Sequence, residues 1–497
     1  MSQHSATPQS PYYRQDYLEH IGGLQALNQE YDYWIDNKDI KGVIPEGVRG
    51  TLYRIGPGRN KIGEQVFGHW FDGDGMVHGF SFTDKGVWYR NRYVRTPKYI
   101  EETEKQKVLY RGFGTNRTGG ILANIGRLPT NVANTNLMYH AGKLFALWEG
   151  GKPWQIDPTY LTTVGEYDYQ GKLGKFDAFS AHGKISPLDG CYYNHGVGFG
   201  KKGPQVMVYK INPQGEMIQK TALPIGIAGF IHDFSFVGEY LVYWIHPLGI
   251  KNPIPFLSGQ KTFNDCVQYQ PSWGMQAIVV RADTLKEVYR IRLDPCVIVH
   301  TGNAWQEGDT LVLDVIRYEN FKVNTWLSNL LSEDIKFDNE TLSGGKFYRY
   351  SLDLKSLSYE CHKIENTLPA EFPQWDLRFS GKKTRYSYHV ATNDRGYNGS
   401  NYFNTFQKID NQTNTVTTRV LSEGEFLSEV VFMPTGEQEA EGYLCAVVYD
   451  SHQHLSSVVI FEPHGELSEV ARIPLKNHVP FGFHGGYTTK CFLPKGV

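Results

Sequence analysis

The chain has 497 residues, with 50 lysines and arginines against 52 aspartates and glutamates. This near balance gives no overall field that would favour a nucleic-acid or strongly acidic partner. The chain also holds 32 tyrosines, 27 phenylalanines and 10 tryptophans together with 52 glycines and 24 prolines, a composition typical of many short strands joined by tight turns. One large all-β domain is allowed at this length.

The first 25 residues are polar, and we expect residues 1–25 to form a loose arm without the basic and apolar regions of a secretory signal. The six cysteines are scattered without a CxxC pair, which favours free thiols in a reducing, cytoplasmic compartment. No run of about 18 apolar residues occurs, so the sequence predicts no membrane span.

Strand patterns begin at GTLYRIGPG and recur to the end of the chain, for example in KLFALWEG, PQVMVYKIN, YLVYWIHP, DTLVLDVIRYE and SSVVIFEP. Gly, Pro, Asn or Asp bound these segments, and no regular alternation with helices or biased linker divides them. The sequence therefore predicts a single all-β domain over residues 26–497. At roughly 60 to 70 residues for a decorated four-stranded blade, this length fits a β-propeller of about seven blades.

Two apolar insertions interrupt the strand pattern, HPLGIKNPIPFLSGQKTF and NFKVNTWLSNLLSEDIKF. One interpretation is that they are ordinary loops packed over the body. The other is a reversible, peripheral attachment to a membrane, with Lys251, Lys261 and Lys322 near anionic headgroups. The residues predicted to face the membrane are Ile254, Phe256, Leu257, Trp326, Leu327, Leu330 and Leu331.

Four histidines stand in similar settings, each beside small residues and at the end of an apolar or aromatic run: His182 in FSAHGKISP, His232 in GFIHDFSF, His300 in CVIVHTGNAW and His484 in VPFGFHGGY. A lone buried histidine is more often a polar core residue than a ligand. Separations of 50, 68 and 184 residues exclude a local metal clip and require distant units to converge on one axis. An all-imidazole donor set would suit Fe(II), Cu(II), Zn or Ni.

Metal-bound imidazoles usually donate their other N–H to a carboxylate. Candidate partners are the glutamates in apolar surroundings, where an unpaired charge is costly: Glu149 in FALWEGG, Glu371 in PAEFPQWD and Glu429 in FLSEVVFMP. A calcium loop counted from Asp72 in HWFDGDGMVH would have Met76 and Thr83 at its fifth and twelfth positions, where ligands are needed, so the motif indicates a structural turn. No phosphate-binding glycine loop or serine-hydrolase elbow occurs.

These motifs together resemble the carotenoid cleavage oxygenases over nearly the whole chain and in family order: GTLYRIGPG, HWFDGDGMVH, NTNLMYHAGKLFALWEGG, FSAHGKISP, HDFSF, HTGNAW, EFPQWD and VPFGFHGGY. The resemblance implies a seven-bladed propeller with loops and short helices capping the metal face. It also implies one Fe(II) on the four histidines, backed by the three glutamates. Gly183 and Gln306 stand where many members carry Pro and Glu, and neither change removes a ligand.

The activity implied by this resemblance is oxidative cleavage of a conjugated C=C bond of a carotenoid or apocarotenoid into two carbonyl products, with dioxygen as cosubstrate. Trp148, Phe230 and Phe372 are then expected to line the substrate tunnel rather than only the blade core. Thr135 is expected beside an open iron position, as its family counterpart is. Alternatives within the family are retinyl-ester isomerisation with hydrolysis, and cleavage of stilbenes by enzymes that carry a lysine where Trp148 stands. The complete histidine quartet disfavours a non-catalytic scaffold.

Overall fold

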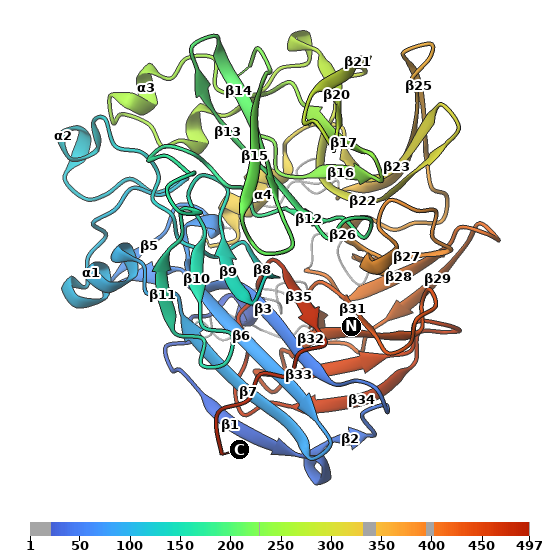
Figure 1. Ribbon diagram of the computed structural model, residues 1–497. Helices are drawn as coiled ribbons and strands as arrows, with labels where there is room; N and C mark the ends of the chain where they lie inside the picture. The colour runs from blue at the N-terminus through green and yellow to red at the C-terminus, as the bar shows by residue number, and fades with distance from the viewer. Residues whose placement is uncertain (1–20, 228, 332–343, 394–401, 497) are drawn as a thin grey trace, which may run out of the picture.

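The computed structural model describes residues 21–227, 229–331, 344–393 and 402–496. Seven antiparallel sheets of four to six strands surround a central axis in this part of the chain (Figure 1), so the predicted seven-bladed β-propeller is confirmed. Two further sheets contain only two strands each.

The blades follow one another along the chain, and in most of them the first strand lies nearest the axis. The first blade contains β1 (Asp32–Asp36), β3 (Gly50–Arg59), β6 (Asp74–Thr83), β7 (Gly86–Tyr93) and β35 (Gly485–Thr488); the second contains β8 (Asn136–His140), β9 (Lys143–Leu147), β10 (Trp154–Ile156) and β11 (Thr163–Glu166). The third contains β12 (Lys184–Ile185), β13 (Tyr192–Gly200), β14 (Gly203–Ile211) and β15 (Met217–Pro224); the fourth contains β16 (Phe234–Val237), β17 (Tyr240–Ile245), β20 (Met275–Arg281) and β21 (Glu287–Leu293); the fifth contains β22 (Val297–Glu307), β23 (Thr310–Tyr318), β24 (Lys346–Asp353) and β25 (Ser358–Lys363). The sixth contains β26 (Ala370–Gln374), β27 (Tyr386–Ala391), β28 (Thr405–Asp410) and β29 (Thr415–Val420); the last contains β2 (Lys41–Gly42), β30 (Glu425–Leu427), β31 (Val431–Pro434), β32 (Gly442–Asp450), β33 (Leu455–Phe461) and β34 (Glu469–Pro474). The two small sheets are β4 (Lys61–Ile62) with β5 (Gln65–Val66), and β18 (Leu248–Gly249) with β19 (Gln268–Tyr269).

Strands from the two ends of the chain close the ring. The C-terminal strand β35 pairs with β3 as the innermost strand of the first blade, with Arg54 opposite Gly485. The N-terminal strand β2 pairs with β34 at the outer edge of the last blade, with Lys41 opposite Arg472. The end of the chain that carries His484 is thereby fixed at the axis.

The hydrophobic core is divided among the interfaces between consecutive blades. Seven apolar clusters lie at these interfaces, and the cluster between the last and first blades includes Leu52, Phe80 and Ile460. Inner strands such as β3 are buried along their whole length, whereas the outer strand β15 alternates between buried and exposed residues. Strands buried on both faces explain the long apolar runs in the sequence.

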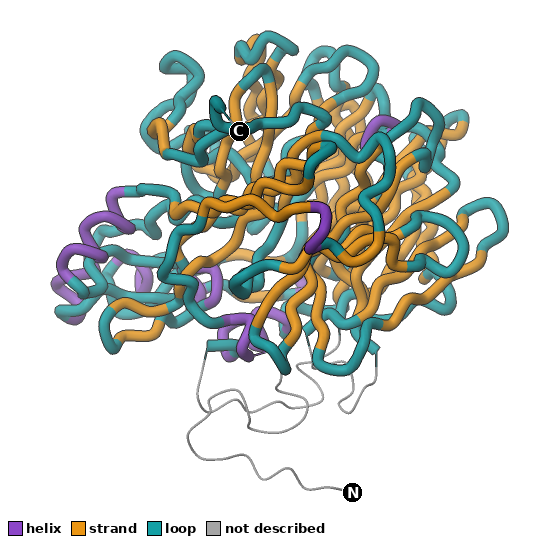
Figure 2. Tube along the Cα trace, turned by 90° about the horizontal axis from the view of Figure 1, so that it is seen from below, coloured by secondary structure: helices purple, strands orange, loops and turns teal. Residues whose placement is uncertain are grey.

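Helices are short and lie mostly at one side of the strand body (Figure 2). They are α1 (Pro97–Lys105), α2 (Gly120–Asn124), α3 (Ile254–Leu257) and α4 (Val323–Asn329), together with 3₁₀ turns at Asn37–Asp39, Trp70–Asp72, Asn264–Cys266, Pro271–Trp273 and Leu377–Phe379. Among the described residues, none of these helices has the length and apolar character needed to cross a bilayer.

The N-terminal arm lies mostly outside the described residues, but its last part packs on the body. Leu24 is buried with Trp70 and Phe481, and the Phe481 N–H donates to the Gly23 carbonyl at 2.7 Å. The segment 332–337 of the second apolar insertion also lies outside the described residues. All six cysteines are unpaired, as predicted.

Candidate metal centre

Each blade contributes one histidine or glutamate near the axis. The histidines lie at the inner strands of four blades: His182 before β12, His232 before β16, His300 in β22 and His484 before β35. The glutamates come from the other three blades: Glu149 after β9, Glu371 in β26, and Glu429 between β30 and β31. The wide spacing of these residues therefore reflects the succession of blades.

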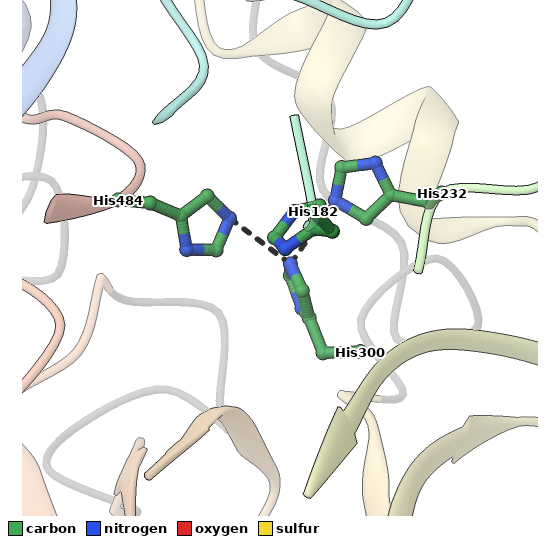
Figure 3. A group of neighbouring side chains, drawn as sticks. All are labelled: His182, His232, His300 and His484. Carbon is green, nitrogen blue, oxygen red and sulfur yellow. Dashed lines mark hydrogen bonds between the residues drawn. The ribbon is translucent and has the colours of Figure 1, made fainter. Parts of the chain in front are cut away.

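The four histidines converge at one point of the interior (Figure 3). One ring nitrogen from each lies within 4.8 Å of those of the others. His300 Nε2 lies 3.1 Å from His232 Nε2 and 3.2 Å from His484 Nε2. The ring of His182 stands at centroid distances of 4.3 Å from His232 and 4.4 Å from His484. The structure thus brings together the whole set chosen from the sequence.

Carboxylates stand behind three of these imidazoles. His300 Nδ1 is 2.5 Å from Glu371 Oε2, and His484 Nδ1 is 3.0 Å from Glu429 Oε1. His232 Nδ1 lies 3.1 Å from Glu149 Oε1, which is ion-pair distance, although this contact lacks the angle of a hydrogen bond. No carboxylate lies behind His182 among the described residues, and its buried Nε2 has no hydrogen-bond partner.

This arrangement fits a cation. A carboxylate at Nδ1 keeps the proton on that nitrogen and leaves the Nε2 lone pair facing the centre. Lone pairs 3.1 and 3.2 Å apart repel one another unless a positive charge lies between them. Four neutral nitrogen donors suit Fe(II), Cu(II), Zn or Ni.

Burial favours the uncharged form of two of the ligands. It lowers the pKa of His182 well below its ordinary value and that of His484 to about 4. Burial also acts against protonation of His232, but the Glu149 carboxylate outweighs it and raises the pKa of that imidazole. A bound metal dication would compensate the same carboxylate charge.

Two of the glutamates remain ionised although they are largely withdrawn from solvent. Burial raises the pKa of Glu429, but His484 and Arg54 more than offset this and bring it to about 2. Burial likewise opposes ionisation of Glu371, yet His300 and the Tyr318 hydroxyl lower its pKa below the ordinary value. Each therefore accepts hydrogen bonds as an anion.

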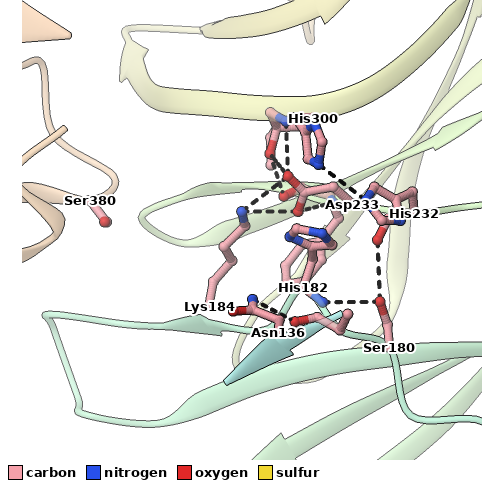
Figure 4. Close-up of polar contacts among 12 residues, drawn as sticks. Asn136, Ser180, His182, Lys184, His232, Asp233, His300 and Ser380 are labelled. Atoms are coloured by element: carbon pink, nitrogen blue, oxygen red, sulfur yellow. Dashed lines mark hydrogen bonds and ion pairs between the residues drawn. The ribbon is translucent and has the colours of Figure 1, made fainter. Parts of the chain in front are cut away.

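A polar network on the other side of the histidines joins three blades (Figure 4). Asp233 Oδ2 accepts hydrogen bonds from the Thr301 N–H at 2.9 Å and the Thr301 hydroxyl at 2.8 Å. Lys184 Nζ stands 2.9 Å from Asp233 Oδ1. Asp233 and Thr301 each directly follow a ligand histidine, so the network fixes two ligand segments to each other. The sequence analysis missed it, although the polar residue after each histidine was visible in HDFSF and HTGNAW.

An apolar cavity reaches the histidine cluster from the side of α4. The residues predicted to line a tunnel, Trp148, Phe230 and Phe372, line this cavity, as does Thr135. Phe372 adopts a left-handed φ of 51° next to Glu371, and its ring centroid lies 5.2 Å from that of His300. Further cavity residues that the sequence analysis did not select are Trp70, Phe71, Phe113, Val299, Phe321, Tyr402, Phe403 and Phe483. Trp70 and Phe71 belong to HWFDGDGMVH, where the aromatic pair was the available signal.

A second, more polar cavity lies on the Asp233 side. His300, His484 and Phe372 border both cavities, whereas His182 borders only the polar one and His232 only the apolar one. Asn136, Lys184, Thr301 and Gln374 contribute polar groups to its wall. The histidine cluster therefore separates an apolar space from a polar one.

The predicted membrane-facing residues divide into three groups. Ile254 is 68% and Leu257 44% exposed, as predicted for a surface contact. For Phe256 and Leu330 the prediction is wrong, because they are only 4% and 3% exposed. The Arg111 guanidinium lies over the Phe256 ring at 4.1 Å, and Leu330 packs in an aromatic cluster. Trp326 and Leu327 line the apolar cavity, and Leu331 packs partly buried against the same aromatic cluster.

Exposed apolar residues of α2 adjoin those of α3, a feature that the sequence analysis missed. The Gly126 N–H donates to the Leu257 carbonyl at 2.8 Å, which ties the two segments together. Ile121 and Leu122 of α2, together with Ile125 and Leu128 just after it, are exposed. We call these four residues, with Ile254 and Leu257, the α2–α3 patch.

Comparisons with known proteins place this architecture among described ones. The model of the family described as retinal pigment epithelial membrane protein matches residues 24–489. The apocarotenoid-15,15'-oxygenase of Synechocystis sp. is 34% identical to 97% of this chain and 98% of its own length. A cobalt-substituted structure of the Synechocystis apocarotenoid oxygenase matches with a TM-score of 0.86 at 32% identity, covering 96% of this chain and 99% of that one. The lignostilbene-alpha,beta-dioxygenase isozyme III of Sphingomonas paucimobilis is 26% identical over 95% of this chain and 97% of its own length.

Proposed function

The chain belongs to the retinal pigment epithelial membrane protein family, which includes the carotenoid cleavage oxygenases, and on that premise we propose that it is an Fe(II) dioxygenase acting on an apocarotenoid or carotenoid. That it is an oxygenase follows from its relatives. The proposed reaction adds both atoms of dioxygen across one conjugated C=C bond. That bond breaks and two C=O groups form, so no external reductant is needed.

In this proposal His182, His232, His300 and His484 hold the iron. Bound iron would supply the activation of dioxygen. Glu371 and Glu429 keep His300 and His484 turned so that Nε2 faces the centre, and Glu149 stands ready to do the same for His232. Neutral imidazoles would leave a metal dication its full charge, next to the apolar cavity in which the alkene would lie.

The observation that carries the substrate class is the apolar cavity that ends at the histidine cluster, where His232, His300 and His484 border it. Its walls are aromatic and aliphatic, and the few polar groups that line it are those of the centre itself or hydroxyls such as Thr135 and Tyr318. A polyene would bind by burial of its apolar surface, and the walls would exclude water from the reacting bond. Thr135 lies at the inner end, where its carbonyl accepts the His484 N–H at 3.2 Å.

Stilbene cleavage is the second candidate, because a lignostilbene dioxygenase is among the relatives. A phenolate substrate needs a cationic or hydrogen-bonding partner in the cavity. Trp148 stands next to Glu149 in the cavity wall and offers a large apolar ring instead. A polyene therefore suits this wall better than a phenolate.

We further propose that the enzyme collects its substrate from a membrane through the α2–α3 patch. A polyene that crossed water would expose its surface at a cost of about 25 cal/mol per Å². Buried Phe256 of α3 lies between the patch and the cavity: the Phe256 and Phe263 ring centroids are 5.5 Å apart, and those of Phe263 and the cavity residue Phe113 are 5.6 Å apart. The exposed Lys251 and Lys261 stand nearby for anionic headgroups.

The test is incubation of the iron-loaded protein in air with apocarotenals, apocarotenols, carotenoids, a hydroxystilbene and a retinyl ester, followed by mass identification of the products. We expect two carbonyl fragments from an apocarotenoid or carotenoid, each carrying one oxygen atom from labelled dioxygen. Cleavage of the stilbene alone would support the second candidate. Release of a retinol isomer without uptake of labelled oxygen would overturn the proposed oxidative cleavage. It would not count against the proposed metal centre.

A further inference from the structure

The three carboxylates behind the histidines differ in what compensates their charge. Glu149 has His232 as its partner and is only partly buried. Glu371 accepts hydrogen bonds from His300, the Phe372 N–H and the Tyr318 hydroxyl. Among the described residues, Glu429 is the one of the three that also meets a buried cation, Arg54.

Glu429 is held from four directions. Its Oε1 accepts from His484 Nδ1 at 3.0 Å and from Gln374 Nε2 at 2.9 Å. Its Oε2 accepts from an Arg54 guanidinium nitrogen at 2.5 Å and from the Gly485 N–H at 3.0 Å. With both oxygens engaged, the carboxylate has one orientation available to it.

Arg54 contacts the ligand segment itself as well as its carboxylate. The second terminal nitrogen of its guanidinium donates to the Phe483 carbonyl at 2.9 Å, and the backbone of Arg54 pairs with Gly485 in the β3–β35 ladder. The planar fork of an arginine holds two acceptors in fixed geometry, which a point charge does not. One acceptor here is the carbonyl of Phe483, the residue directly before His484, and the other is the carboxylate that accepts from His484 Nδ1.

We propose that Arg54 is a positioning residue of the metal centre, which fixes His484 for coordination by holding both Glu429 and the Phe483 carbonyl. This inference rests on the proposed metal centre. Removal of groups that orient a ligand typically lowers metal affinity by about 10 to 100-fold. Arg54 is therefore expected to affect metal affinity although it lies outside the ligand set.

A matched control lies on the same strand. Arg59 is also on β3, is also buried, and pairs with the buried Asp74 at 2.7 Å. Its other partners are Thr103 and the Tyr99 carbonyl, and none of these groups contacts a ligand histidine. Loss of Arg54 leaves the buried Glu429 carboxylate without its cation. Loss of Arg59 takes one of two cations from the buried Asp74, which keeps Lys98 Nζ at 3.0 Å. Both substitutions should therefore destabilise the fold. Only loss of Arg54 should change the metal centre.

The experiment is a titration of metal-free protein with Co(II), followed by its visible absorption, for the wild type and the Arg54→Met, Arg54→Lys and Arg59→Met variants. Thermal unfolding checks that each variant is folded. Arg54→Met should raise the Co(II) Kd about 10 to 100-fold and change the absorption spectrum. Arg54→Lys, which keeps the charge but not the fork, should recover part of the affinity. Arg59→Met should lose stability yet bind Co(II) as the wild type does.

Wild-type Co(II) affinity and spectrum in a folded Arg54→Met protein would overturn the inference. If that variant does not fold, Arg54→Lys decides, because unchanged affinity there would also contradict a positioning role. An equal loss of affinity in Arg59→Met would show a general effect of destabilisation and overturn it as well. Absence of Co(II) binding by the wild type would instead count against the metal centre itself.

Discussion

At the residue scale, the chemistry of the centre depends on which imidazole nitrogen each partner occupies. Glu371 and Glu429 take Nδ1 of His300 and His484, so that Nε2 is the atom left for a metal. Within the described part of the chain His182 has no such carboxylate, and its Nε2 is buried without a hydrogen bond. A histidine elsewhere in the core, such as His389, instead pairs its Nε2 with Gln407 Oε1 at 3.0 Å. Burial alone therefore does not make a ligand.

This difference predicts the effect of removing single histidines. His232→Ala should lose bound iron and cleavage activity together, because three imidazoles hold a labile Fe(II) less tightly than four. His389→Leu removes a buried histidine from outside the centre and should retain the metal. Metal analysis of both purified proteins after anaerobic iron loading measures the effect. A full iron content in His232→Ala would contradict the four-histidine centre.

The sequence sufficed for the histidines and glutamates because each stands in a distinctive local setting of small or apolar neighbours. It did not suffice for the residues that hold them. Arg54 lies within the strand GTLYRIGPG, 375 residues from Glu429, and a charged residue in a strand gives no sign of a partner at that distance. Tyr318 is likewise the last residue of an ordinary strand pattern, and that pattern gives no sign that its hydroxyl donates to Glu371.

At the element scale, the inner strands were predictable and the connecting segments were not. Strands show an apolar pattern that follows from burial between blades. A short helix such as α3 offers only its composition, which does not indicate which side faces solvent. The sequence therefore predicts Phe256 at the surface, whereas in the structure Arg111 covers its ring. The α2 segment has only five residues and gave too little periodicity to attract notice.

The α2–α3 patch carries the prediction for membrane attachment. Leu122 is 87% exposed on α2 and Ile254 and Leu257 are exposed on α3, so each would place apolar surface in the lipid interface. The triple variant Leu122→Ser, Ile254→Ser, Leu257→Ser should therefore sediment much less with vesicles that contain anionic lipid than the wild type does. Co-sedimentation at matched protein and lipid concentrations measures this difference.

The control for that measurement is Leu188→Ser with Leu357→Ser. Leu188 and Leu357 are exposed in the β12–β13 and β24–β25 turns. Neither turn contributes a residue to the wall of the apolar cavity. The control should bind vesicles as the wild type does. Equal binding by all three proteins, or by none, would remove the membrane proposal without affecting the metal centre.

At the scale of the whole molecule, formation of the histidine cluster depends on closure of the ring of blades. The last strand β35 completes the first blade, and His484 immediately precedes it. The other ligands come from the third, fourth and fifth blades, so the four meet only when the ring is closed. The number of blades followed from chain length and strand repetition. The pairing of β35 with β3 did not, because four residues carry no signal of their partner strand.

The many buried, neutral histidines make the whole molecule sensitive to acid. Burial lowers the pKa of His69 and His78 to about 3 and that of His389 to about 4. In the unfolded chain each would take up its proton near pH 6.5. Between about pH 6.5 and 4 the unfolded state therefore binds more protons than the folded state, and stability falls as the pH falls.

Each such histidine should remove about 1.4 kcal/mol of unfolding free energy for every pH unit below 6.5. Urea unfolding of the metal-free protein at several pH values between 7.5 and 4.5 gives this slope. In His389→Leu the unfolding free energy should fall less steeply with pH, by about 1.4 kcal/mol per pH unit. The variant lacks a group that binds a proton in the unfolded chain but not in the folded one. Gln407 keeps the Leu368 N–H as a donor in that variant, so its side-chain oxygen stays paired. An identical slope in the two proteins would mean that His389 already carries its proton in the folded core, which its burial and its contact with a single amide oxygen oppose.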